Sequence, residues 1–281
     1  MKALFDKTSF LSATQTTAQY STSFSSAVKL LHPSIRQDIY NIYGFVRVAD
    51  EIVDSFEGYP QEEMLDRFEA EYAFALKNGL STDLIINAFQ HTVKKHNIDQ
   101  KLVQAFLKSM RADLTKSTYT TDEEIAEYIY GSADVVGLMC LKVFVNGNKE
   151  EYNKLEASAQ KLGSAFQKIN FLRDLQHDIN ELDRVYFPGV DLSTLDDKSK
   201  RKLLDEIKAE FDDAYEGIIR LPNVAKLGVY VAYKYYLQLL KKIDKTPTKT
   251  LKTQRVRVSN VTKSWIVCKA IIRCKLNICK Q

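Results

Sequence analysis

Glycine, proline and cysteine are all scarce in this 281-residue sequence. With only 10 glycines and 5 prolines, it lacks the frequent turn signals that an architecture of many short strands requires. Its four cysteines show neither a CxxC pair nor a zinc-ligand spacing, so we expect no zinc site, no disulfide framework and a reducing, cytoplasmic location. No segment approaches the roughly 18 apolar residues of a membrane-spanning helix, and the amino terminus has no signal-peptide pattern.

Hydrophobic residues make up 45% of the chain and recur at the spacing of amphipathic helices. Pro33 stands where the first turn of a helix tolerates proline, the Gly58-Tyr59-Pro60 break follows that helix, and Pro222 separates two later ones. The helices predicted in this way span residues 33–55, 61–77, 82–95, 99–112, 122–145, 149–180, 197–219 and 224–243. Because no strand pattern, internal repeat or low-complexity linker is present, the sequence predicts one all-α domain over residues 1–259.

Charge is distributed unevenly along the chain. Residues 245–281 contain ten Lys or Arg and no acidic residue, so residues 1–244 carry a net −6 within a total of +4. From residue 260 to residue 281, basic residues alternate with Trp265 and several aliphatic residues, which is typical of helices that bind membrane surfaces. We therefore expect a basic amphipathic tail over 260–281 that associates peripherally with the inner face of the cell membrane. Nucleic-acid binding is disfavoured because no nucleic-acid-binding module accompanies this tail.

Two pairs of aspartates are the most informative motif in the sequence. Asp50 and Asp54 lie in VRVADEIVD, and Asp174 and Asp178 lie in NFLRDLQHD, each pair spaced i, i+4. That spacing places both carboxylates of a pair on one face of a helix, one turn apart. Mg²⁺ prefers carboxylate oxygens and usually binds together with the phosphates of a substrate. The two pairs therefore predict a metal-bridged diphosphate site.

Further polar residues share a helix face with each aspartate pair. Tyr43 and Arg47 precede the first pair, and Gln167 and Asn170 precede the second, at helical spacing. Because apolar residues surround both motifs, we expect both helices to be buried and their aspartates to be paired or metal-bound. The alternative to a metal site is two buried salt-bridge networks, formed by Arg47 and Arg173.

Five segments of the chain, in this order, resemble the squalene/phytoene synthase family. They are YSTSFSSAVKLL at 20–31, IYGFVRVADEIVD at 42–54, MRADL at 110–114, YIYGSADVVGLMCLKVF at 128–144 and LGSAFQKINFLRDLQHDINELDRVYFP at 162–188. The DExxD form of the first aspartate motif and the GSADVVGLMCL stretch are most similar to bacterial phytoene synthases of carotenoid pathways. One position departs from the family, because Asp134 stands where many members have glycine.

The resemblance implies an isoprenoid synthase fold, a helix bundle around a central cavity, and the activity of a prenyltransferase. It also implies that Asp50, Asp54, Asp174 and Asp178, with Asn170, hold about three Mg²⁺ ions, or Mn²⁺ in their place, on the substrate diphosphates. The residues that would bind or orient these diphosphates are Ser21, Ser23, Tyr43, Arg47, Gln167, Asn170, Arg173 and Arg255.

The implied reaction is the head-to-head condensation of two geranylgeranyl diphosphates, through prephytoene diphosphate, to phytoene, without NADPH. Val28 favours this longer substrate because thirty-carbon dehydrosqualene synthases have an aromatic residue at that position. The closest alternative is a dehydrosqualene or squalene synthase that uses farnesyl diphosphate. A non-catalytic family member is disfavoured by the intact aspartates and arginines. A terpene cyclase is disfavoured because NxxxDxxxD at 170–178 differs from the NxxxSxxxE motif of cyclases.

Overall fold

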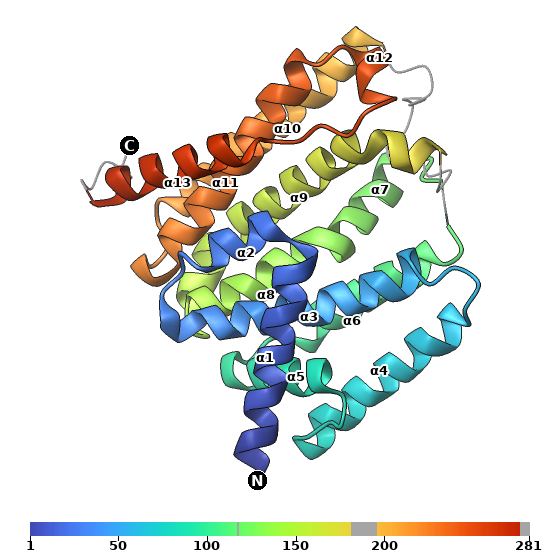
Figure 1. Ribbon diagram of the computed structural model, residues 1–281, viewed down its shortest axis with the longest axis vertical. Coiled ribbons are helices and arrows are strands. Elements are labelled where there is room, and N and C mark those ends of the chain that lie inside the picture. Colours follow the sequence, from blue (N-terminus) through green and yellow to red (C-terminus); the bar gives the residue numbers. More distant parts are fainter. Residues whose placement is uncertain (117, 181–195, 276–281) are drawn as a thin grey trace.

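The protein is described by a computed structural model that covers residues 1–116, 118–180 and 196–275, with side chains except at 176–180 and 274–275. Within these ranges every regular element is a helix (Figure 1), which confirms the predicted all-α fold. The elements are α1 (Lys2–Tyr20), α2 (Thr22–Val28), α3 (Pro33–Asp54), α4 (Gln61–Asn78), α5 (Leu84–His96), α6 (Gln100–Asp113), α7 (Asp122–Ile129), the π-helix η1 (Tyr130–Asp134), α8 (Val135–Phe144), α9 (Lys149–Asn180), α10 (Asp197–Ile218), α11 (Asn223–Lys245), α12 (Thr248–Leu251) and α13 (Asn260–Lys275).

Local chemistry at the helix ends explains why the predicted boundaries hold. His32 accepts a hydrogen bond from the Ser34 N–H at 3.3 Å where α3 begins. At the start of α7, the Thr121 hydroxyl accepts one from the Glu124 N–H at 3.2 Å. Helix α5 ends at Asn97, whose φ of 50° lies in the left-handed region that stops a helix.

The predicted helices do not include the short helices α2 and α12, nor two larger features of the fold. The first is α1, which packs against α3 and α5. The second is η1, a π-helical turn that interrupts the predicted helix over 122–145. A Cβ on Gly131 in this turn would lie 1.9 Å from the Ser109 hydroxyl oxygen, so the close packing of η1 on α6 requires glycine. Such π-turns are frequent at functional sites, and η1 borders the cavity described below.

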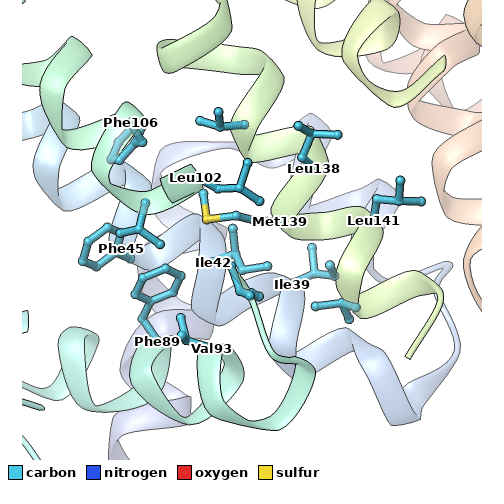
Figure 2. Close-up of a cluster of buried hydrophobic side chains, with 14 of the residues drawn as sticks. Ile39, Ile42, Phe45, Phe89, Val93, Leu102, Phe106, Leu138, Met139 and Leu141 are labelled. Carbon is cyan, nitrogen blue, oxygen red and sulfur yellow. The ribbon is translucent and has the colours of Figure 1, made fainter. Parts of the chain in front are cut away.

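The first hydrophobic core joins α3, α5, α6 and α8 (Figure 2). At its centre, Phe45 stacks on Phe89 with ring centroids 4.0 Å apart, and both side chains are fully buried. Phe106, Leu138 and Met139 complete the same cluster. This core holds α3, and therefore the first aspartate motif, rigidly in the bundle.

The second hydrophobic core joins α9, α10 and α11 and is rich in tyrosine. Phe211 and Tyr233 pack edge to face at 5.5 Å within it. Helix α13 packs on the outside of α11, where Ala270 is 2% exposed (Figure 1). The tail predicted from residue 260 is therefore helical through Lys275 and lies against the bundle; its separation from the domain over 1–259 stays a prediction. None of the described helices has the length and apolar character needed to cross a bilayer.

Candidate active site

A cavity of about 320 Å³ lies between the two cores, enclosed by α2, α3, η1, α8, α9, α10 and α11. Its walls are mostly apolar. Along α9 the lining residues run from Leu155 to Asn170, a length of about 22 Å at 1.5 Å per residue. Glycines set how closely the walls approach: a Cβ on Gly228 of α11 would lie 2.5 Å from a methyl carbon of Leu31. The predicted central cavity is therefore present, and it is long and narrow.

Polar side chains gather at one end of this cavity. The Tyr236 hydroxyl donates to Asn170 Oδ1 at 3.1 Å, the Asn170 amide donates to Gln167 Oε1 at 3.4 Å, and the Gln167 amide donates to the Ser132 hydroxyl at 3.5 Å. All four residues line the cavity, as does Tyr43. This chain of hydrogen bonds connects α11, α9 and η1 across the polar end.

The first aspartate motif continues α3 beyond the lining residue Tyr43. Arg47 contacts Asp50, with an N–O distance of 2.6 Å, and also forms an ion pair with Glu51. The guanidinium lies 4.5 Å from the centre of the Tyr20 ring. Burial opposes the charge on Arg47, but Asp50 and Glu51 more than offset this and raise its pKa above the ordinary value. Arg47 therefore stays cationic at the cavity end.

One expectation about this motif was wrong. The apolar pattern of the helix predicted buried aspartates, but the Asp50 side chain is 33% exposed and Asp54 is exposed. The reason is that only one side of the last two turns of α3 packs in the core, through Ala49, Ile52 and Val53, whereas Asp50 and Asp54 lie on the other side, at the end of the helix. Carboxylates in this position can reach a ligand that enters from solvent.

The second aspartate motif continues α9 beyond Asn170. Asp174 accepts hydrogen bonds from Arg173 at 2.5 Å, and its Oδ1 lies 2.6 Å from Nε of Arg255. Burial alone would lower the pKa of Arg173, but hydrogen bonds with Asp174 and Tyr236 hold it above the ordinary value. Asp178 also lies in α9, but its side chain is outside the described residues.

Tyr43 and the serines of α2 lie at the same end. Ser21 accepts a hydrogen bond from the Phe24 N–H at 3.3 Å and so caps α2, and its side chain also bonds the Tyr43 phenol. Burial raises the pKa of Tyr43, although Arg47 and Ser21 partly offset this, so the phenol keeps its proton and can donate it to a ligand. Ser23 lies half-buried in the first turn of α2.

The sequence interpretation missed three residues of this end: Tyr236, Ser132 and Tyr20. Tyr236 contacts the second motif from a distant helix, and Ser132 lies on the unpredicted π-turn. The five-segment pattern contained Ser132 and Tyr20, so it offered a signal for these two, whereas Tyr236 lies in none of the segments.

The carboxylates of the two aspartate motifs are the candidate ligands for Mg²⁺. Among the described side chains, which leave out Asp178, no three acidic, His or Cys residues come close enough together to form a ligand cage. Mg²⁺ does not require one, since it keeps several waters and binds through one or two carboxylates plus substrate phosphates. Asp50 and Asp174 supply such carboxylates, partly exposed and adjacent to cations. The ion pairs expected as the alternative to metal binding are also present, and the donor set fits both roles.

Asp134 does not line the cavity. A Cβ on Gly163 of α9 would lie 3.1 Å from Asp134 Oδ1, so this carboxyl points between η1 and the helices behind it. Burial, followed by the nearby Glu210 carboxylate, raises its pKa to about 7, and Lys168 and Lys161 oppose that shift. The residue that departs from the family pattern thus lies against α9, near Glu210, and is not one of the lining residues.

The comparison with protein families decides the classification. Residues 17–262 match the family model described as squalene/phytoene synthase. The chain belongs to this family. Phytoene synthase 1, chloroplastic, of Solanum lycopersicum is 28% identical over 245 residues, covering 81% of this chain and 59% of that protein. Phytoene synthase 1, chloroplastic, of Arabidopsis thaliana is 28% identical over 264 residues, covering 88% and 62%. The chain thus spans less than two thirds of these relatives.

Solved structures of the squalene/phytoene synthase type share the fold. A dehydrosqualene synthase superimposes with a TM-score of 0.83 at 20% identity, covering 96% of this chain and 98% of that one. A squalene synthase from Alicyclobacillus acidocaldarius superimposes with a TM-score of 0.75 at 23% identity, covering 86% and 96%. At these identities the likeness establishes the fold alone.

Proposed function

We propose that this protein is a phytoene synthase, which condenses two geranylgeranyl diphosphates head to head and releases phytoene and two diphosphates. The observation that carries the proposal is that charged residues lie at one end of a cavity whose walls are otherwise apolar. Both aspartate motifs, with Arg47 and Arg173, continue from helices that form the polar end of the cavity, and Arg255 reaches Asp174 from the segment between α12 and α13. An isoprenoid diphosphate has the matching shape, with a long hydrocarbon attached to a polyanion.

The first step is loss of diphosphate from one substrate. Asp50, Asp54, Asp174 and Asp178, with Asn170, would hold Mg²⁺, which neutralises the charge on the departing diphosphate. Arg47, Arg173 and Arg255 lie at the two motifs and would donate charge-assisted hydrogen bonds to phosphate oxygens. These arginines already pair with the carboxylates of the motifs. When a diphosphate binds, its oxygens would replace the carboxylates as partners of the arginines, so no arginine would be left without an anion.

Three neutral donors are positioned to orient the first diphosphate. The Tyr43 phenol is held by Ser21 and stacks on Phe24 at 4.7 Å between ring centroids. The Gln167 and Asn170 amides are oriented through Tyr236 and Ser132. A diphosphate held by such groups leaves in a fixed direction, so that the allylic cation forms next to the double bond of the second substrate.

The cavity wall then excludes water from the carbocations. Attack by the second substrate and loss of a proton close the cyclopropane ring of prephytoene diphosphate. Its ionisation, rearrangement and a second proton loss give phytoene. Phe24, Phe144 and Phe166 line the cavity among aliphatic side chains, and a dry wall prevents the cations from being quenched to alcohols.

Small residues along the wall favour the longer substrate. Val28 lines the cavity and is 2% exposed, where a bulky aromatic side chain would occupy the volume. Ala27, Ala159 and Gly163 also line it. The named curated relatives are phytoene synthases, whereas the similar solved structures are dehydrosqualene and squalene synthases. Condensation of two farnesyl diphosphates is therefore the second candidate.

Product analysis tests the proposal. Purified protein is incubated with Mg²⁺ and either geranylgeranyl or farnesyl diphosphate, with and without NADPH, and extracted hydrocarbons are identified by mass. We expect a forty-carbon product from geranylgeranyl diphosphate without NADPH. A thirty-carbon product from farnesyl diphosphate alone would replace the substrate but retain the condensation. A folded protein that gives no hydrocarbon from either substrate would overturn the proposal in favour of a non-catalytic family member.

A further inference from the structure

A second pocket lies on the opposite side of α11 from the cavity. It has a volume of about 430 Å³ and is formed where α13 packs on α11 (Figure 1). Lys234 and Lys241 of α11 and Lys269 and Arg273 of α13 all line it. None of the described residues along this groove is acidic. A groove with cations on both walls is complementary to an anion.

Aromatic rings hold these cations in place along the groove. The Lys269 ammonium lies 4.7 Å from the centre of the Trp265 ring, and the Lys234 ammonium lies 5.1 Å from that of Tyr230. Arg273 donates to the Tyr230 hydroxyl at 3.4 Å. The arrangement is one of positioned charges next to amphipathic rings, which is typical of proteins that bind the interface of a membrane.

The outer face of α13 carries an apolar stripe that the bundle does not use. Val261, Trp265 and Ile272 are 81%, 59% and 58% exposed. At offsets of four and eleven residues they fall within about 40° of one another on the helix. The inner face, which includes Ala270, already packs on α11. Lys269 and Arg273 lie between the two faces, beside the stripe, so apolar and basic residues form one surface.

Charge is segregated toward this surface. The segment 245–281, which contains α13, holds ten basic residues and no acidic one, whereas residues 1–244 carry a net −6. Lys269 and Arg273 bring part of this positive charge to the groove, which favours the approach of this face to an anionic surface, whereas Arg255 pairs with Asp174 at the cavity. The charge distribution therefore agrees with the local chemistry of the groove.

Helix α11 is the wall that the groove and the cavity share. Val229 and Ala232 line the cavity, and Tyr230 and Lys234 line the groove. The two spaces are thus separated by one helix, about 10 Å in diameter with its side chains. A ligand in the groove lies that close to the hydrocarbon cavity.

We propose that the face formed by α11 and α13 docks on an anionic phospholipid bilayer, with lipid phosphates in the groove and the stripe of Val261, Trp265 and Ile272 in the interfacial layer. The cations supply attraction to the headgroups and the stripe supplies apolar burial. Docking in this way would place the reaction cavity next to the membrane, with only α11 between them, and would fix the orientation of the protein on the bilayer. The inference concerns binding, so it stands or falls independently of the reaction catalysed.

The test uses the full chain and vesicles in a co-sedimentation assay. Wild-type protein is expected to bind vesicles that contain phosphatidylglycerol, to bind pure phosphatidylcholine vesicles far more weakly, and to lose affinity as salt increases. Lys241→Glu with Lys269→Glu should weaken binding more than tenfold, since each positive charge contributes about fivefold near an anionic surface. Trp265→Ser with Ile272→Ser should weaken binding at every salt concentration, because apolar burial is not screened.

Matched control variants separate this face from general effects of charge and hydrophobicity. Lys77→Glu with Lys101→Glu makes the same charge change at exposed positions on α4 and α6. Leu4→Ser with Leu11→Ser removes two apolar side chains that are 65% and 54% exposed on α1. Both controls should bind vesicles like the wild type. Equal loss in the controls and the α11–α13 variants, or wild-type binding that ignores lipid charge, would overturn the proposal.

Discussion

The two aspartate-bearing helices hold their carboxylates in different ways. On α3, cation and anions come from one helix: Arg47 binds Asp50 and Glu51, three and four residues ahead. On α9, Asp174 is held by its neighbour Arg173 and by Arg255, which is 81 residues further along the chain. The first arrangement can form with a single helix, whereas the second is complete only when the segment between α12 and α13 lies against α9.

The balance of charge also differs between the two motifs. Among the described side chains, Arg47 on α3 contacts two carboxylates, those of Asp50 and Glu51, whereas Asp174 on α9 contacts two arginines, Arg173 and Arg255. From these contacts we propose a division of labour, in which α3 contributes more to metal binding and α9 more to diphosphate binding. The Mg²⁺ dependence of the first two variants below tests this division, and the later predictions concern the α9 side and the cavity wall.

Loss of either carboxylate should have the largest effect. Asp50→Asn and Asp174→Asn should each reduce product formation on the order of 10³-fold, because charge on the leaving diphosphate is no longer neutralised. If the two sides differ as described, only Asp50→Asn should be partly rescued by excess Mg²⁺. Rates over a range of Mg²⁺ concentrations, with circular dichroism to confirm folding, check this. Identical Mg²⁺ dependence in both variants would contradict the division.

Removing the distant arginine should have the next largest effect. Arg255→Gln should lower kcat/KM about tenfold to a hundredfold, mainly through KM, since a charge-assisted bond to phosphate is lost. Arg255→Lys should recover part of this, because it keeps the charge but not the fork geometry. Arg257→Gln is the matched control, an exposed arginine in the same segment. An equal effect at Arg257 would mean that only the overall charge of the segment matters.

A smaller effect is expected from the hydroxyl that links α11 to the second motif. Tyr236→Phe removes the donor to Asn170 Oδ1 but keeps the stacking on Phe166, whose ring centroid is 3.8 Å away. The hydroxyl also bonds Arg173, so loss of these two hydrogen bonds, each worth about 1 kcal/mol, should slow product formation by between about fivefold and thirtyfold. Tyr235→Phe, a buried tyrosine that does not line the cavity, should leave the rate unchanged. Steady-state rates of both variants decide whether the amide orientation matters.

The smallest effect on the reaction rate is expected at Asp134, whose substitution should change stability instead. The pKa of Asp134 is raised to about 7, so as pH rises from 3.8 toward that value the unfolded chain loses a proton that the folded protein keeps. The free energy of unfolding should therefore fall across this range. Asp134→Asn should remove that dependence and stabilise the protein above neutral pH, by no more than about 4 kcal/mol. Urea unfolding at several pH values measures it; parallel pH profiles for variant and wild type would contradict the assignment.

The sequence could predict most helices because their apolar residues form clear stripes. It could not predict α1, whose buried residues are the small Ser9, Ala13 and Thr17, so no apolar stripe marks the helix. It could not predict η1 either, because the π-turn depends on the packing of Gly131 against Ser109 of another helix. Apolar periodicity shows which side of a helix is buried. The formation of α1 and η1 depends instead on the shape of the helices they pack against, which periodicity does not show.

In the candidate site, contacts within one helix could be predicted from the sequence, and contacts between distant helices could not. The contact of Arg47 with Asp50 follows from spacing on one helix. The family resemblance gave Arg255 only as a diphosphate-binding residue, and its contact with Asp174 was not predicted. Tyr236 was missed because nothing in the local sequence relates α11 to α9. The exposure of Asp54 was predicted wrongly, since hydrophobic neighbours do not show which side of a helix the core leaves uncovered. Local chemistry is readable from the sequence, and pairings between distant helices are not.

The ratio of diphosphate released to hydrocarbon formed tests the account most directly. It is measured with purified protein, Mg²⁺ and geranylgeranyl diphosphate. If both motifs act on one condensation, two diphosphates appear for each hydrocarbon, and Asp50→Asn and Asp174→Asn suppress both products together. One diphosphate per hydrocarbon, or diphosphate release without hydrocarbon, would contradict the account and indicate cyclisation or hydrolysis of a single substrate.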